Sequence, residues 1–225
     1  MRNKWTLILG TLLLALAACS PAFAAGTPKA GSSGADARPV LLVVGDSLSA
    51  GYGLETGAGW VALLQKRLRE RHAPWRVVNA SISGETTAGG MSALPALLQR
   101  DQPKVVVIEL GGNDALRGLS LAATESNLRS MASACQMFGA RVLIIGMRIP
   151  PNYGPAYTRG FEAIFPRVAR LQHTALVPFL LSGVVDHPDW FQADNIHPTA
   201  AAQPTMLDTV WPVLAPLLHL GTGKP

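Results

Sequence analysis

Short apolar runs alternate with longer amphipathic stretches along most of this 225-residue chain. The apolar runs are rich in β-branched residues, which is typical of strands buried on both faces. They predict strands at 40–44, 76–79, 105–110, 141–147 and 175–177. The amphipathic stretches predict helices at 60–71, 86–100, 121–138, 161–172 and 198–220. A loop rich in proline and tyrosine is expected at 150–157. This order predicts an α/β domain with a mostly five-stranded parallel sheet covered by helices on both faces.

Three polar motifs come directly after predicted strands. Ser47 follows the first strand, Gly84 the second and Asn113 the third. The carboxyl ends of parallel strands meet at one edge of an open α/β sheet, and ligands bind there. We therefore expect these three residues to lie close together.

The first 24 residues have the pattern of a secretory signal. Arg2 and Lys4 precede a mostly apolar stretch at 6–18, and Ala22-Phe23-Ala24 fits a cleavage site. A second interpretation stays open, because residues 16–19 resemble a lipobox in which Cys19 would carry a lipid. Residues 25–38 are predicted to be a flexible linker, 39–220 the folded domain and 221–225 a tail. Both interpretations predict export to the periplasm, and the second adds an outer-membrane anchor.

Charge and cysteine content limit the possible functions. Without Arg2 and Lys4 the net charge falls from +5 to about +3, and no basic stripe with interleaved aromatic residues suggests nucleic-acid binding. Weak attraction to an anionic membrane surface stays open. Cleavage after Ala24 would leave Cys135 as a single thiol, which its helical pattern predicts to be buried. Histidine and carboxylate spacing predicts no metal site, and we expect no cofactor.

Ser47 is the candidate nucleophile. Gly45 before it permits a tight turn at the end of the strand, although a serine there is more often a turn or cap residue. The motif differs from the G-x-S-x-G elbow, because position 49 is serine instead of glycine. The serine also lies near the start of the domain. An α/β-hydrolase is therefore disfavoured.

His197 is the candidate general base, with Asp194 as the carboxylate that orients it. The two residues are three positions apart, so in a turn or helix their side chains point the same way. A carboxylate there can hold the imidazole tautomer and stabilise the imidazolium. A helix start with Asp194 as its cap would explain the same residues.

Gly84 and Asn113 are candidate oxyanion donors. Glycine offers a backbone N–H that no side chain obstructs, and asparagine offers a side-chain N–H. Both residues are also common in turns, so each signal is weak alone. Asp46, Glu85 and Asp114 beside the motifs are predicted to stabilise loops.

The four motifs in their order resemble those of the SGNH, or GDSL, hydrolase superfamily. They are Gly45-Asp46-Ser47-Leu48-Ser49, Ser83-Gly84, Gly111-Gly112-Asn113-Asp114 and Asp194-x-x-His197-Pro198. Residues 79–87 and 109–114 resemble more narrowly the bacterial periplasmic thioesterase I, arylesterase and lysophospholipase group. The resemblance spans about residues 39–218. It implies a three-layer α/β/α, flavodoxin-like fold, with Ser47, His197 and Asp194 as catalytic residues and Ser47 N–H, Gly84 N–H and the Asn113 side chain as oxyanion hole.

These observations predict an exported serine esterase that acts on carboxylic esters or thioesters with apolar acyl chains. The resemblance implies an acyl-binding surface at 115–120 and 149–157, where Leu116, Leu119, Ile149 and Tyr153 are the candidate contacts. Small-molecule or lipid esters are the expected substrates, and we expect a monomer. Two alternatives stay open: a carbohydrate-ester deacetylase on the same scaffold, and an envelope binding protein without activity.

Overall fold

The computed structural model describes residues 37–222, which form a five-stranded parallel sheet with helices on both faces. The sheet order is β2-β1-β3-β4-β5, and every pairing is parallel. The strands are β1 (Val40–Gly45), β2 (Arg76–Asn79), β3 (Val105–Glu109), β4 (Arg141–Ile145) and β5 (Ala175–Val177). Every residue of β1 and β3 is buried, as their continuous apolar sequence predicts. The predicted α/β class and five-stranded sheet are confirmed.

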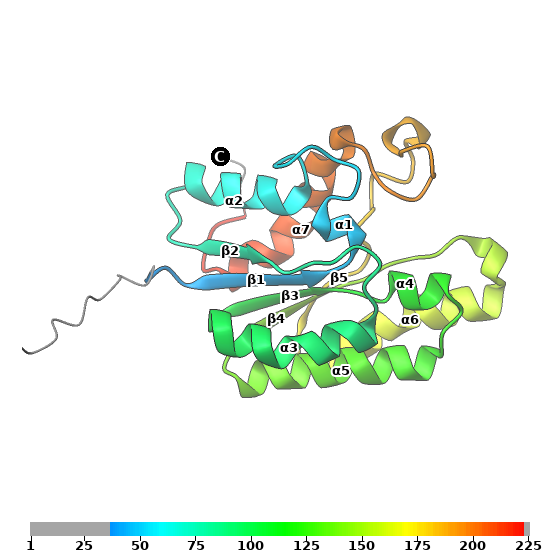
Figure 1. Ribbon diagram of the computed structural model, residues 1–225, viewed down its shortest axis with the longest axis horizontal. Helices are drawn as coiled ribbons and strands as arrows, with labels where there is room; N and C mark the ends of the chain where they lie inside the picture. Colours follow the sequence, from blue (N-terminus) through cyan, green and yellow to red (C-terminus); the bar gives the residue numbers. More distant parts are fainter. Residues whose placement is uncertain (1–36, 223–225) are drawn as a thin grey trace, which may run out of the picture. The chain divides into compact units, whose positions relative to one another are not determined.

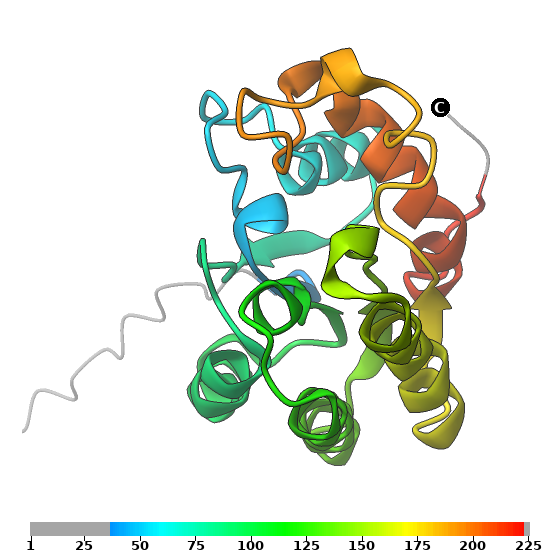
Figure 2. The same cartoon turned by 90° about the vertical axis from the view of Figure 1, so that its right-hand side faces the viewer.

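Two helices cover one face of the sheet and three cover the other (Figures 1 and 2). The first pair is α2 (Trp60–Glu70) and α7 (Gln203–Leu217). The other three are α3 (Thr87–Asp101), α5 (Leu121–Met137) and α6 (Pro155–Leu171). Two short helices, α1 (Ser47–Ala50) and α4 (Gly112–Leu116), begin directly after β1 and β3 at the same end of the sheet. Single 3₁₀ turns are η1 (Pro151–Tyr153), η2 (Pro188–Trp190) and η3 (Ala200–Ala202).

Two helices begin more than one residue away from their predicted starts. Helix α6 begins at Pro155, inside the predicted loop 150–157, because a proline in the first turn loses no helical hydrogen bond. Helix α7 begins at Gln203 and not at Pro198. Pro198 forms an isolated β-bridge with Phe191, and this pairing keeps the chain extended just beyond His197.

The predictions for the N-terminal 36 residues lie outside the described part of the chain. These are the signal sequence, the lipobox at Cys19 and nearly all of the linker. Within residues 37–222, no helix combines the length and the apolar character needed to cross a bilayer. The predicted burial of Cys135 is confirmed: it lies in α5 without solvent exposure, and burial raises the pKa of its thiol to about 12.

Gln203 joins three parts of the fold at the start of α7. Its side chain is 1% exposed, and its Oε1 accepts a hydrogen bond from the backbone N–H of Trp60, the first residue of α2. The N-cap residue of α2 is Gly59, which has no side chain to accept a hydrogen bond from the first turn. The Gln203 Nε2 donates to the carbonyl of Thr199, 3.2 Å away and two residues after His197. One buried amide thus fixes both α2 and the histidine loop.

We predict that Gln203→Leu lowers the free energy of unfolding by about 1–3 kcal/mol, because the buried Trp60 N–H then has no acceptor. Urea unfolding followed by circular dichroism measures the loss, and the m-value should not change. Gln99→Leu, at an exposed position of α3, is the matched control. A midpoint for Gln203→Leu that equals the control's midpoint would contradict this role.

Candidate active site

Ser47 is held at the carboxyl end of β1 by the turn that begins α1. A Cβ on Gly45 would lie 2.8 Å from the Ser49 Cβ, so the turn requires glycine at that position. Asp46 caps α1, because its Oδ1 accepts the Leu48 N–H at 3.0 Å. The Ser47 carbonyl accepts the N–H groups of Gly51 and Tyr52. These bonds fix the backbone from which the serine hydroxyl projects.

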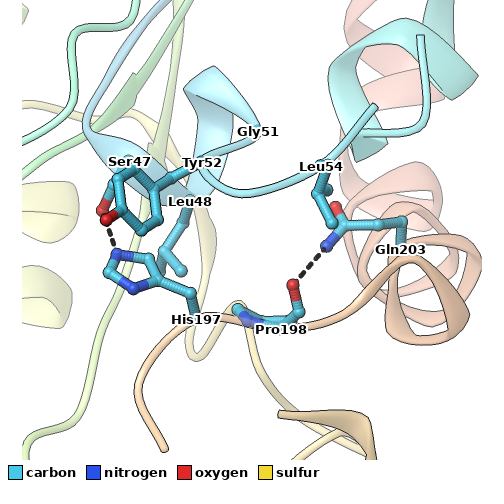
Figure 3. Close-up of a pocket in the computed structure, with 8 residues that line it drawn as sticks. All are labelled: Ser47, Leu48, Gly51, Tyr52, Leu54, His197, Pro198 and Gln203. Carbon is cyan, nitrogen blue, oxygen red and sulfur yellow. Dashed lines mark hydrogen bonds between the residues drawn. The ribbon is translucent and has the colours of Figure 1, made fainter. Parts of the chain in front are cut away.

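His197 and Asp194 form a hydrogen-bonded line with Ser47. The His197 Nε2 lies 2.8 Å from the Ser47 Oγ, and the His197 Nδ1 lies 2.6 Å from the Asp194 Oδ2 (Figure 3 shows the bond to Ser47). The second Asp194 oxygen accepts the backbone N–H groups of Ile196 and His197. Asp194 therefore organises a turn and does not cap a helix.

The hydrogen bonds to Asp194 keep it charged. The backbone N–H of His197 contributes most, followed by its ring, and together they lower the pKa of Asp194 to about 2. A permanent carboxylate beside Nδ1 holds the proton on that nitrogen, which leaves Nε2 as the acceptor facing Ser47.

Tyr52 covers the imidazole. The two ring centroids are 4.5 Å apart, and Figure 3 shows Tyr52 beside Ser47 and His197. Gln192 links the loops that carry these rings: its side-chain N–H donates to the Tyr52 carbonyl, and its backbone N–H donates to the His197 carbonyl. Two contacts therefore join the loop of His197 to the residues that follow α1: the ring contact with Tyr52 and the hydrogen bond from Gln192 to the Tyr52 carbonyl.

The three predicted oxyanion donors are the backbone N–H groups of Ser47 and Gly84 and the side-chain amide of Asn113. Among the described residues, the backbone N–H groups of Ser47 and Gly84 have no hydrogen-bond acceptor. Gly84 has a φ of +81°, which favours glycine, and its carbonyl accepts the Arg117 guanidinium at 2.9 Å. The Asn113 Nδ2 donates one hydrogen to the Asp46 Oδ2 at 3.2 Å. Its second hydrogen is free to bind a substrate oxygen.

Two buried carboxyl groups lie beneath this arrangement. Asp46 is 3% exposed and Glu109 is 2% exposed, and the sheet register places Gly45 beside Glu109. The Glu109 Oε2 accepts the Ser49 hydroxyl at 2.7 Å and the Asp46 backbone N–H at 3.4 Å. Burial raises the pKa of Asp46 to about 6, and burial followed by the charge of Asp46 raises the pKa of Glu109 well above its usual range.

Asp114 anchors α4, the short helix that also carries Asn113. It is 3% exposed and accepts hydrogen bonds from the Thr87 N–H at 2.9 Å and from the Thr124 hydroxyl at 3.3 Å. These partners belong to α3 and α5. Asp114 is predicted to stabilise a loop; it lies instead in α4 and connects this short helix to α3 and α5.

The predicted acyl-binding residues occupy different environments. Leu119 and Tyr153 are 42% and 37% exposed, while Leu116 packs against the core. Ile149 is 7% exposed and belongs to the core itself. Two hydrogen bonds join the segment 149–157 to the segment 115–120. The Tyr153 hydroxyl donates to the Leu116 carbonyl, and the Tyr157 hydroxyl donates to the Leu119 carbonyl.

Several residues of the site have no signal in the sequence. Glu109 lies inside the strand predicted at 105–110, and its place beside Asp46 depends on the pairing of β1 with β3. Tyr52 and Gln192 also require the fold to bring them to His197. His187 also precedes a proline, but its ring stacks on Trp190 with the centroids 4.2 Å apart, and His197 is the histidine that bonds to Ser47 and Asp194.

The hydroxyl, imidazole and carboxylate in one hydrogen-bonded line, beside unpaired donors, are the arrangement of a serine hydrolase. Their position at the carboxyl edge of a parallel sheet, without a G-x-S-x-G elbow, separates this site from that of the α/β-hydrolases. Residues 43–203 match the model of the GDSL-like lipase/acylhydrolase family. The chain belongs to this family, and it is an ester-hydrolysing enzyme. The alternative of a binding protein without activity is thereby removed.

Relatives support this assignment over most of the chain. The chain is 56% identical over 182 residues to esterase TesA of Pseudomonas aeruginosa, which covers 81% of this chain and 90% of that protein. It is 43% identical over 185 residues to thioesterase 1/protease 1/lysophospholipase L1 of Escherichia coli strain K12, with 82% and 88% covered. A crystal structure of TesA superposes with a TM-score of 0.77 and 56% identity, covering 79% of this chain and 99% of that one.

The buried acids predict how stability depends on pH. A carboxyl group whose pKa is raised in the folded state binds its proton more tightly there than in the unfolded chain. Stability therefore falls as the pH rises from the ordinary carboxyl range through the raised pKa. We predict that the Tm of the wild type falls between pH 5 and 8, and that Glu109→Gln flattens this fall.

The glutamine oxygen can still accept from Ser49 and Asp46, but the side chain has no charge to bury. At pH 8 the Tm of Glu109→Gln should exceed that of the wild type by roughly 2–4 °C, the shift that about 1 kcal/mol causes in a chain of this size. Glu55→Gln, at an exposed glutamate, is the control. Parallel pH curves for wild type and Glu109→Gln would contradict the buried acid's role.

Proposed function

We propose that this enzyme hydrolyses carboxylic esters and thioesters with apolar acyl chains through an acyl-enzyme on Ser47. The observation that carries the proposal is the line from the Asp194 Oδ2 through His197 to the Ser47 Oγ, with distances of 2.6 and 2.8 Å. Both are ordinary hydrogen-bond lengths for a nucleophile, its base and the group that orients the base.

The first half of the reaction forms the acyl-enzyme. The Ser47 Oγ attacks the carbonyl carbon while its proton passes to the His197 Nε2. The carbonyl oxygen becomes an oxyanion as the tetrahedral intermediate forms. When that intermediate collapses, the bond to the leaving oxygen or sulfur breaks, and His197 returns the proton to the leaving group. Asp194 stabilises the imidazolium between these steps.

The second half releases the acid. A water molecule gives a proton to the His197 Nε2 and attacks the acyl carbon, and the Ser47 Oγ leaves and regains the proton. In both halves, the Ser47 N–H, the Gly84 N–H and the Asn113 side chain are the proposed donors to the oxyanion. Loss of one such donor typically lowers the rate ~10²–10³-fold.

Exposed apolar side chains near the site favour acyl chains as substrates. Leu119 follows α4, the helix of Asn113, and the Tyr153 hydroxyl donates to the carbonyl of Leu116 in that helix. Ile82, at 57% exposure, lies two residues before Gly84. The names of the relatives include esterase, thioesterase and lysophospholipase. Lysophospholipids and acyl-thioesters are therefore included in the proposal, as is the periplasmic location that the first 24 residues predict.

We predict that p-nitrophenyl octanoate is hydrolysed with a kcat/KM at least about 10-fold above that of the acetate, because each buried methylene contributes about 0.8 kcal/mol. Steady-state kinetics over chain lengths from two to twelve carbons measure this preference. Ser47→Ala should lower kcat by ~10³-fold or more on every ester.

Ser92→Ala, an exposed serine of α3 that donates to the Ala88 carbonyl, is the matched control and should keep full activity. A preference for acetate would favour the deacetylase instead. Full activity in Ser47→Ala would contradict the proposed nucleophile on any substrate.

A further inference from the structure

Asp46 touches two parts of the machinery with its two carboxylate oxygens. The Oδ1 accepts the N–H of Leu48 at 3.0 Å, within the turn that presents Ser47. The Oδ2 accepts the side-chain N–H of Asn113 at 3.2 Å, across 67 residues of sequence. One carboxylate therefore joins the helix of the nucleophile to the helix of the proposed oxyanion donor.

A carboxylate partner determines which way an asparagine amide faces. The oxygen and nitrogen ends of the amide have nearly the same shape, and only their hydrogen-bond partners distinguish them. An ionised carboxylate only accepts hydrogen bonds, so it favours the nitrogen end. The nitrogen has two hydrogens, and the one that Asp46 does not bind remains available at the same end of the amide.

We propose that Asp46 is a positioning residue, which fixes the amide orientation of Asn113 and through it the donor for the oxyanion. The inference rests on the proposed function, because it assumes that Asn113 binds the oxyanion. Asp46 itself does not touch the reacting atoms. It acts by keeping the Asn113 nitrogen, and not its oxygen, toward the nucleophile turn.

The surroundings of Asp46 hold it in one place. Its backbone N–H donates to the Glu109 carboxyl group at the end of β3, and its side chain is almost wholly buried. A Cβ built on Gly112 would lie 3.3 Å from the Asp46 Oδ2, so glycine at this position lets α4 approach closely. A rigid acceptor transfers its own position to the amide that it binds.

The test is a double-mutant cycle on Asp46 and Asn113. Asp46→Asn preserves the shape but offers one oxygen and one nitrogen, so it cannot accept from both Leu48 and Asn113. We expect kcat to fall about 10- to 100-fold with KM within about 2-fold of the wild type, because the interaction counts in the transition state only. Affinity for a trifluoromethyl ketone with the same acyl chain should fall by the same factor as kcat/KM.

The second side of the cycle separates positioning from general damage. Asn113→Ala should lower kcat by ~10²–10³-fold. In the Asn113→Ala background, Asp46→Asn should lower it further by less than about 3-fold, because the residue through which Asp46 acts is gone. Asp101→Asn, at an acid in the last turn of α3, is the control and should keep wild-type kinetics.

The possible failures are distinct. Equal losses from Asp46→Asn in both backgrounds would contradict positioning through Asn113 and leave the oxyanion role of Asn113 intact. Wild-type kinetics for Asn113→Ala would instead contradict the proposed oxyanion hole. If Asp46→Asn does not fold, by near-ultraviolet circular dichroism, Asp46→Ala enters the same cycle. Its short side chain places no new donor against Asn113, and the same non-additivity is expected.

Discussion

The hydrogen bond between the His197 Nε2 and the Ser47 Oγ joins segments 150 residues apart, and the rest of the site depends on it. The serine lies on a turn directly after a buried strand, whereas the histidine lies on a long loop between β5 and α7. A loop has no ladder of backbone bonds to fix it. It is held by the bridge from Phe191 to Pro198 and by the amides of Gln192 and Gln203. The position of the imidazole therefore depends on these contacts of the loop.

The position of Asn113, the side-chain donor of the proposed oxyanion hole, depends instead on a buried carboxylate. Asp46 and Glu109 lie almost fully out of solvent, with no cation within hydrogen-bond distance among the described residues. Burial of a carboxyl group opposes folding unless it is protonated or well hydrogen-bonded. A rigid acceptor for Asn113 is obtained at that cost. Such a trade of stability for a fixed active-site geometry is common in enzymes.

Much of this arrangement could be predicted from the sequence, because it depends on strand order. The runs at 76–79 and 175–177 are strands with the predicted bounds, and the motifs of Ser47 and Asn113 lie at the same edge of the sheet. Helix α6 shows the limit. Its first turn contains Pro155 and Tyr157, and together with Pro150, Pro151 and Tyr153 these residues give the segment the composition of a loop. The start of the helix could therefore not be predicted from local composition.

The contacts beneath the site could not be predicted, because they depend on register. Glu109 reaches Ser49 only because β1 and β3 pair with Gly45 beside Glu109. The link from Asp46 to Asn113 requires the close approach of α1 and α4, and the position of Tyr52 over His197 requires the loop closure that Gln192 provides. None of these pairs has a fixed spacing along the chain.

The central claim is that Ser47 carries the acyl group during turnover. The most direct measurement is mass spectrometry of the enzyme quenched in acid within milliseconds of mixing with a p-nitrophenyl ester, followed by peptide mapping. We predict an added mass equal to the acyl group on the peptide that contains Ser47, which decays as the free acid accumulates. Turnover without any adduct, or an adduct on another residue, would contradict the account.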